Sequence, residues 1–375
     1  MSDWLVLPEY GRSTLAEILP AMAAHLVPGL AGTNDPFGLP AARRYVLAMI
    51  DGLGLELLRT HRARVPYLAG LVDRAHELTS AVPSTTATSL TCLGTGIPPG
   101  RHGIVGYSFR AHDWILNALL WDDRLVAEEF QPTPTWFQRL NDRQVATTAV
   151  TLAQFEGSGL TRAGLRGPRF VGLADEQDAA DRIARIVQAS RAGMSSLVYA
   201  YDRRLDHTGH GLGCGSTAWL ETLDRMDDWL ERLRAELDPE VCLLITGDHG
   251  MVDVPNDRQI ILEDTPGLAN GLELIGGEGR LRQLYTARPD EVAAQWRRRL
   301  GDRALVVRRE EALEAGWFGP VAEEFRPRIG DVLVAMADDW AVMTLTKQGE
   351  LTLVGQHGSL TSAEMRVPLL VDAGR

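Results

Sequence analysis

Several short apolar runs in this chain end at a carboxylate or an imidazole side chain. The clearest is Val241–Ile245, which a Thr-Gly pair separates from the adjacent residues Asp248 and His249. Such a run predicts a buried strand, and longer amphipathic segments lie between it and similar runs. This alternation is typical of a parallel sheet flanked by helices, in which functional side chains gather at the carboxyl ends of the strands.

The chain has 375 residues, of which 45% are hydrophobic, so it can bury a sizeable core. We predict an α/β fold with a mostly parallel central sheet and helices on both faces. The expected helices are Ala179–Ala192 and Ala218–Leu237. The expected strands are Tyr45–Ile50, Gln144–Thr151, Leu197–Tyr201, Val241–Ile245 and Val367–Val371.

The amino-acid composition changes after Pro255, where charged residues and glycines become more frequent. The sequence pattern after this point predicts a small α+β insert. Its expected elements are two strands, Leu281–Thr286 and Ala304–Val307, and one helix, Pro289–Leu300. The strand pattern resumes at Asp331–Met336, which we assign to the core. We therefore predict a catalytic core of residues 1–255 and 331–375, and an insert of residues 256–330 that caps the site.

The composition excludes some partners. The formal net charge of −12 argues against binding of a nucleic-acid polymer or of an anionic membrane. A small anionic substrate remains compatible with this charge, because bound metal ions invert the local field.

The cysteines indicate a reducing compartment. Cys92, Cys214 and Cys242 fit neither a disulfide framework nor a thiolate zinc site. The N-terminal sequence has no basic stretch followed by a long apolar run, and no segment approaches transmembrane length. We expect a cytoplasmic protein with no membrane partner, and the sequence leaves its oligomeric state open.

Three further segments place metal-binding side chains near predicted strand ends. Asp51 directly follows a strand and precedes Gly52, although such a residue is often only a helix cap. Asp206 and His210 are four residues apart, a spacing that brings both groups to one ion in a helix or a tight loop. His207 and Asp202 are alternative candidates for the same metal-ligand positions. His357 lies between Gln356 and Gly358 after another strand.

A hydroxyl-rich segment supplies a candidate nucleophile. Residues 83–96 read PSTTATSLTCLGTG and predict a short helix that begins after Pro83 and stops at glycine. Helix capping explains any one of these hydroxyls. The functional alternative is a nucleophile at a helix N-terminus, where the dipole and free N–H groups favour an anion.

Taken together, three aspartates and three histidines suit two divalent cations with open coordination positions. Two such ions can hold the attacking and leaving oxygens of a phosphoryl transfer. The ligand types suit zinc and also manganese.

The order of these motifs resembles the alkaline phosphatase superfamily, and most closely its type I phosphodiesterase/nucleotide pyrophosphatase branch. The resemblance covers residues 45–255 and 331–371. It implies that Asp51, Thr86, Asp248 and His249 surround one metal, and that Asp206, His210 and His357 hold the other. Thr86 takes the position of the nucleophile, with Thr85 and Ser84 as the next choices.

One position departs from that branch. An asparagine that holds a phosphoryl oxygen usually stands three residues after the nucleophile, and this chain has Ser89 there. The Ser89 hydroxyl could still donate one hydrogen bond to the substrate. His102, in the loop after the nucleophile helix, is interpreted as structural.

The resemblance implies a metal-dependent hydrolase that cleaves phosphodiester or pyrophosphate bonds of a small, nucleotide-like substrate through a phosphothreonine intermediate. It implies two divalent ions, with zinc as the first expectation. A phosphomonoesterase and a phosphonate hydrolase are the alternatives within the superfamily, and a phosphoglycerate mutase usually needs a longer chain. Outside enzymes, the alternative is an inactive metal-binding module.

Overall fold

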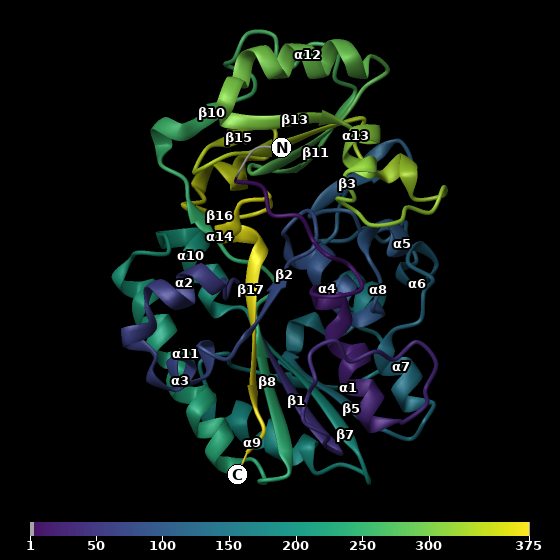
Figure 1. The fold of residues 1–375 in the computed structure, drawn as a ribbon. Coiled ribbons are helices and arrows are strands. Elements are labelled where there is room, and N and C mark those ends of the chain that lie inside the picture. Colours follow the sequence, from purple (N-terminus) through teal and green to yellow (C-terminus); the bar gives the residue numbers. More distant parts are fainter. Residues whose placement is uncertain (1–3, 375) are drawn as a thin grey trace.

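A seven-stranded sheet forms the centre of the structure, a computed structural model that describes residues 4–374 (Figure 1). Its strands, in spatial order, are β2 (His76–Thr79), β17 (Arg366–Asp372), β8 (Val241–Thr246), β1 (Arg44–Ile50), β7 (Ser196–Asp202), β5 (Ala146–Leu152) and β6 (Arg169–Leu173). The five strands from β8 to β6 pair in parallel, and β17 is antiparallel to both of its neighbours. The predicted mostly parallel sheet is confirmed.

Helices cover both faces of this sheet because successive residues of each strand point to opposite sides. Val46, Ala48 and Ile50 of β1 face one set of helices, and Tyr45, Leu47 and Met49 face the other. The first set is α2 (Leu55–Thr60), α3 (Pro66–Val72), α9 (Ala179–Ser190) and α11 (Thr217–Glu236). The second is α1 (Ile18–Leu26), α4 (Thr86–Thr95) and α7 (Trp136–Asn141).

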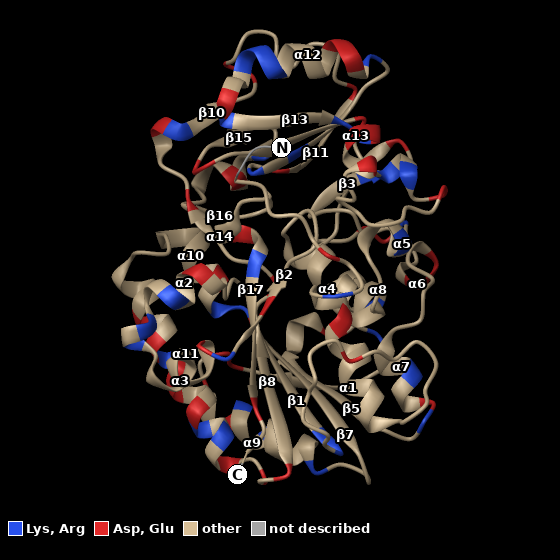
Figure 2. Ribbon diagram, viewed as in Figure 1, with Lys and Arg blue, Asp and Glu red and all other residues tan. Residues whose placement is uncertain are grey.

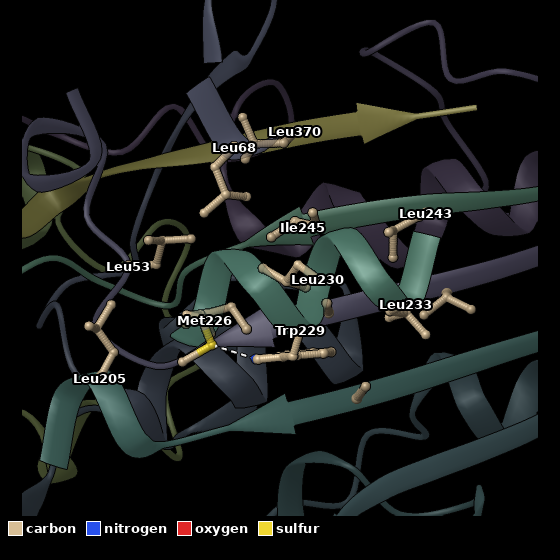
Figure 3. Packing of buried hydrophobic residues seen from close by; sticks show 14 of the residues in the cluster. Leu53, Leu68, Leu205, Met226, Trp229, Leu230, Leu233, Leu243, Ile245 and Leu370 are labelled. Atoms are coloured by element: carbon tan, nitrogen blue, oxygen red, sulfur yellow. Dashed lines mark hydrogen bonds between the residues drawn. The ribbon is translucent and has the colours of Figure 1, made fainter. Parts of the chain in front are cut away.

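The long helix α11 shows how these layers are held together. Its apolar stripe packs onto the sheet, with Met226, Trp229 and Leu230 in the same buried cluster as Ile245 of β8 (Figure 3). Most charged residues of α11 are exposed or half-buried, and Asp227 is the buried exception, which accepts from the amides of Tyr67 and Leu68 of α3. The strands of the sheet carry few charges (Figure 2). The amphipathic pattern that predicted this helix is therefore the pattern that attaches it.

A second, antiparallel sheet lies at the end of the molecule that carries α12 (Figure 1). Its order is β11 (Leu274–Glu278), β12 (Leu281–Tyr285), β14 (Val332–Met336) and β13 (Ala304–Arg308). Helix α12 (Pro289–Leu300) packs on it through Val292 and Trp296. The strands and the helix expected within the insert are thus present.

Residues 331–336, predicted as a strand of the core, supply a strand of the small sheet. β14 pairs with β12 and β13 of the small sheet and makes no pair with the large one. A strand pattern alone does not tell which sheet a strand joins, and here the apolar run completes the smaller sheet. A boundary at residue 330 would separate β14 from its partners, and the remaining outline of the two domains stays a prediction.

The other elements are short. They are the strand pairs β3 (Ser108–Ala111) with β4 (Trp114–Asn117), β10 (Gln259–Ile261) with β15 (Ala341–Met343), and β9 (Val252–Asp253) with β16 (Gly355–Gln356). The remaining helices are α5 (Pro99–His102), α6 (Ala127–Phe130), α8 (Gly159–Gly164), α10 (Arg204–Leu212), α13 (Arg309–Glu314) and α14 (Ser362–Met365). Between residues 4 and 374, no helix is both long enough and apolar enough to span a bilayer.

A buried ion pair joins the small sheet to the core. Arg280, between β11 and β12, donates to both carboxylate oxygens of Glu364 in α14, at 3.0 and 2.7 Å. Both side chains are fully buried. Glu364 also accepts hydrogen bonds from the Ser359 amide and the Thr361 hydroxyl, so it fixes the loop that follows His357.

We therefore expect Arg280→Met to lower the free energy of unfolding by about 3–5 kcal/mol, because it leaves the Glu364 carboxylate buried without its cation. Urea denaturation measures this loss. The exposed Arg288, changed to Met in the same part of the chain, serves as the control and should shift the value by no more than about 0.5 kcal/mol. Equal effects of the two changes would contradict the role given to the pair.

Candidate metal centre

Three adjacent parallel strands deliver the candidate ligands to one edge of the sheet. Asp51 follows β1, Asp248 and His249 follow β8, and Asp206 and His210 lie on α10 directly after β7. β8, β1 and β7 are neighbours in the sheet, so their carboxyl ends meet there. The short strand β16 brings His357 to the same place.

Asp51, Asp248 and His249 form the first group, with one ligand atom of each within 4.8 Å of the others. The Nε2 atom of His249 lies 3.4 Å from Oδ1 of Asp51 and 3.5 Å from Oδ2 of Asp248. All three side chains are buried. The other oxygen of Asp248 accepts hydrogen bonds from the backbone amides of Gly52 and His249, each at 3.1 Å, which fixes the carboxylate.

Asp206, His210 and His357 form the second group. Oδ1 of Asp206 lies 3.3 Å from Nε2 of His210 and 3.7 Å from Nε2 of His357. The two groups adjoin, because the rings of His249 and His357 stack with their centroids 3.6 Å apart. Burial, followed by the neighbouring His249 and His210, holds the pKa of His357 well below its usual range, so that ring is neutral.

The three imidazoles all present the same nitrogen to the centre. Each donates its Nδ1–H to a backbone carbonyl: His249 to Gly250 at 2.9 Å, His210 to Gly355 at 2.7 Å, and His357 to Ser84 at 2.8 Å. A carbonyl oxygen can only accept, so the Nε2 atom of each ring keeps its lone pair. This outer contact is the one that orients metal-binding histidines.

The carboxylates fit a cation equally well. Oδ1 of Asp51, Oδ1 of Asp206 and Oδ2 of Asp248 are buried and have no hydrogen-bond partner. These are the oxygens that face the Nε2 atoms. Burial, together with the charges of Asp206 and Asp248, holds the pKa of Asp51 well above its usual range. A buried carboxylate cluster of this kind is stable when a cation compensates it.

Thr86 is the first residue of α4 and lies at the first group. Its hydroxyl oxygen is 3.2 Å from Nε2 of His249. The preceding residue, Thr85, is the N-cap and its side chain makes no cap hydrogen bond, so the helix N-terminus remains available to an anion. The predicted ligands and Thr86 are therefore brought together.

Ser89 is not brought to this site. Ser89 lies in α4 and its side chain is fully buried. Its hydroxyl lies 2.9 Å from the hydroxyl of Ser80, and Ser80 donates a hydrogen bond to the backbone carbonyl of Asp248. Ser89 does not line the cavity at the metal centre. The geometry gives it a supporting place behind Asp248 and does not support the predicted contact with a phosphoryl oxygen.

Other candidates have structural partners. Asp202 is buried and pairs with Arg182 and Arg204, so it is not a ligand of either group. His102 is buried against Cys92 and accepts from the amide of Ile104, in agreement with its structural interpretation. His207 lines the cavity without joining either group.

A cavity of about 1200 Å³ opens beside Thr86. Aromatic side chains, including Phe155, Phe170 and Tyr201, form part of its wall, and Glu278 of the insert and Lys347 after β15 also line it. The Tyr201 hydroxyl donates to Asp51. Sequence reasoning missed these residues, although the Gly-Gly-Glu-Gly run around Glu278 was a detectable signal.

The fold and the paired Asp/His groups define the class of the protein, a phosphoric ester hydrolase of alkaline phosphatase-like architecture. The chain belongs to the type I phosphodiesterase/nucleotide pyrophosphatase family, whose model matches residues 45–360.

Solved structures share the fold at low sequence identity. Murine ectonucleotide pyrophosphatase/phosphodiesterase 5 has a TM-score of 0.66 and 17% identity over 87% of each chain. The human protein has a TM-score of 0.66 and 18% identity over 88% of this chain and 87% of its own. An inactive threonine-to-alanine variant of the murine protein, solved with AMP, has a TM-score of 0.65 and 17% identity over 87% of each chain.

The closely spaced carboxylates should lower the thermal stability of the metal-free protein and raise that of the metal-loaded protein. Because the pKa of Asp51 is raised in the folded state, the folded protein binds more protons than the unfolded one, and ionisation costs stability as pH rises above about 4. At pH 7 we expect metal-free Asp51→Asn to have a higher Tm than the metal-free parent, and zinc to raise the Tm of the variant less.

Calorimetry with and without zinc measures both effects, and exposed Asp73, changed to Asn, is the matched control. An undiminished zinc response in Asp51→Asn would remove Asp51 from the ligand set.

Proposed function

We propose that this protein is a two-metal hydrolase that cleaves phosphodiester or pyrophosphate bonds of a small, nucleotide-like substrate. One observation carries the proposal: the Thr86 hydroxyl lies at a helix N-terminus, next to Asp51, Asp248 and His249, with the second group adjoining. Family membership and the AMP complex of the murine relative's variant support the substrate class.

In this proposal Asp51, Thr86, Asp248 and His249 hold one divalent ion, and Asp206, His210 and His357 hold the other. Zinc suits these nitrogen and oxygen ligands, and manganese is the alternative. The bound ions supply Lewis-acid stabilisation of the oxygens that gain charge.

Thr86 acts as the nucleophile. Its oxygen attacks phosphorus, the bond from phosphorus to the opposite alcohol or phosphate oxygen breaks, and the leaving group takes up the proton that the Thr86 hydroxyl loses. The phosphoryl group stays bound to Thr86 as an ester until a water molecule hydrolyses that ester and returns a proton to the Thr86 oxygen. The first backbone N–H groups of α4, which no side chain caps, would stabilise the charge on the phosphoryl oxygens. Tyr201 orients Asp51 through its hydrogen bond.

A diester fits the cavity better than a monoester, which carries an extra negative charge. The two arginines of the cavity wall are both occupied. Arg203 forms a bidentate pair with Glu176, and Arg166 donates to the carbonyls of Thr133 and Ala163. Neither guanidinium is free to neutralise that charge, and the third cation of the wall, Lys347, lies against Ser108, the Gly277 carbonyl and the Glu350 carboxylate.

Replacing the nucleophile tests the proposed chemistry. We expect Thr86→Ala to lower kcat by at least about 10³-fold, because the covalent step is lost. Circular dichroism and metal analysis of the same sample should match the parent, since the other ligands remain. Activity close to the parent would show that Thr86 is not the nucleophile and would direct attention to Thr85.

Substrate class and metal dependence are tested together. We expect bis(4-nitrophenyl) phosphate to be hydrolysed with a higher kcat/KM than 4-nitrophenyl phosphate. We also expect a chelator to abolish turnover and zinc or manganese to restore it. A preference for the monoester would favour the phosphomonoesterase alternative, and turnover of neither ester would favour an inactive metal-binding module.

A further inference from the structure

Glu278 is a cavity-lining carboxylate without a function in the proposed chemistry. It lies at the end of β11, in the wall of the cavity that also contains Thr85 and Lys347. Its Oε1 atom is buried and has no hydrogen-bond partner, a property it shares with the three metal-facing aspartate oxygens. Glu278 belongs to neither metal-binding group, so this oxygen requires another explanation.

The surrounding backbone makes room for this side chain. Gly358, directly after His357, has a φ of 128°, and a Cβ atom there would lie 2.7 Å from Cγ and 2.8 Å from Oε1 of Glu278. Gly277, directly before Glu278, has a φ of 74°, and a Cβ atom there would lie 2.0 Å from the carbonyl of Leu281. Only glycine tolerates these two positions, and together they place Glu278 beside the metal centre.

The nearby cations do not satisfy the carboxylate. Arg282 is held by Glu350 and by the Val342 carbonyl. Lys347 donates to the Ser108 hydroxyl at 2.7 Å and to the Gly277 carbonyl at 2.9 Å. Among the described residues, neither cation lies within ion-pair distance of Glu278.

Lys347 also retains binding capacity. An ammonium group has three donors; two of them go to Ser108 and Gly277, and the ion pair with Oε1 of Glu350 is long, at 3.5 Å. Burial and the charge of Glu350 raise the pKa of Glu278 well above its usual range, while Lys347, Arg282 and a hydrogen bond with the Thr85 side chain act in the opposite direction. The cavity wall thus offers an unsatisfied acceptor and a donor near each other.

A hydroxyl group matches this pair, since it donates and accepts at once. An ammonium group on the ligand would satisfy Glu278 but would be repelled by Lys347. We propose that Glu278, with Lys347, is a substrate-binding residue that recognises hydroxyl groups on the alcohol part of the phosphoester. The preferred substrates are then esters of a sugar, glycerol or another polyol, a conclusion that rests on the proposed function.

Two chromogenic diesters with the same leaving group test this inference. Glyceryl 4-nitrophenyl phosphate carries two hydroxyls that propyl 4-nitrophenyl phosphate lacks. We expect the parent protein to favour the glyceryl ester by at least about tenfold in kcat/KM. In Glu278→Ala the ratio of kcat/KM for the glyceryl ester to that for the propyl ester should fall to within about twofold of one. Lys347→Met should also lower this ratio. The exposed Glu314, changed to Ala, is the matched control and should keep the ratio.

Thermal stability separates a binding role from a structural one. A buried acceptor without a partner destabilises the fold, so Glu278→Ala should have a Tm equal to or above that of the parent. A structural role predicts a lower Tm and an unchanged substrate ratio, and that combination would overturn the proposal. Glu278→Gln keeps the shape and a weaker, neutral acceptor, so it should lose only part of the preference.

Binding without turnover makes the inference independent of the proposed reaction. Calorimetry should show glyceryl phosphate binding to the metal-loaded parent at least about tenfold more tightly than propyl phosphate, and Glu278→Ala should remove the difference. If the parent hydrolyses neither diester, the proposed function fails, and this measurement still decides the inference. Equal affinities in the parent would refute the recognition of hydroxyls.

Discussion

The mutual repulsion of three buried carboxylates, Asp51, Asp206 and Asp248, is the constraint around which the structure is organised. Each keeps one oxygen without a protein partner. The protein tolerates the cost because backbone amides, Tyr201 and the strands of the parallel sheet hold these groups from behind. Such an arrangement lowers the stability of the folded protein but favours the binding of a cation, a combination that is common at functional sites.

The sequence predicted the Asp and His side chains that the structure brings together because their signal is local. An apolar run followed by Asp or His identifies both the strand and its functional end, and the parallel topology then brings separate ends together. The sequence did not predict the place of Ser89, because its distance from Thr86 along the helix does not tell which face the sheet covers. The sheet joined by Val332–Met336 and the approach of Glu278 to Gly358 depend on tertiary pairing, which no local pattern records.

The insert is an integral part of the site. Arg280 ties the small sheet to Glu364, and Glu364 in turn holds the loop between Gly358 and Thr361. The same loop begins at the candidate ligand His357, which belongs to the second group and stacks on His249 of the first. Packing of the insert and geometry of the centre are therefore coupled through one short segment.

The position of β17 has a consequence for how the protein is made. This strand is late in the chain but lies inside the sheet, between β2 and β8. Until β17 is synthesised, β8 therefore has an open edge and β2 is paired with no strand of the large sheet. An open edge is a template for association with other chains. The segments that carry Asp51, Asp206 and Asp248 are therefore synthesised before the sheet that positions them is complete.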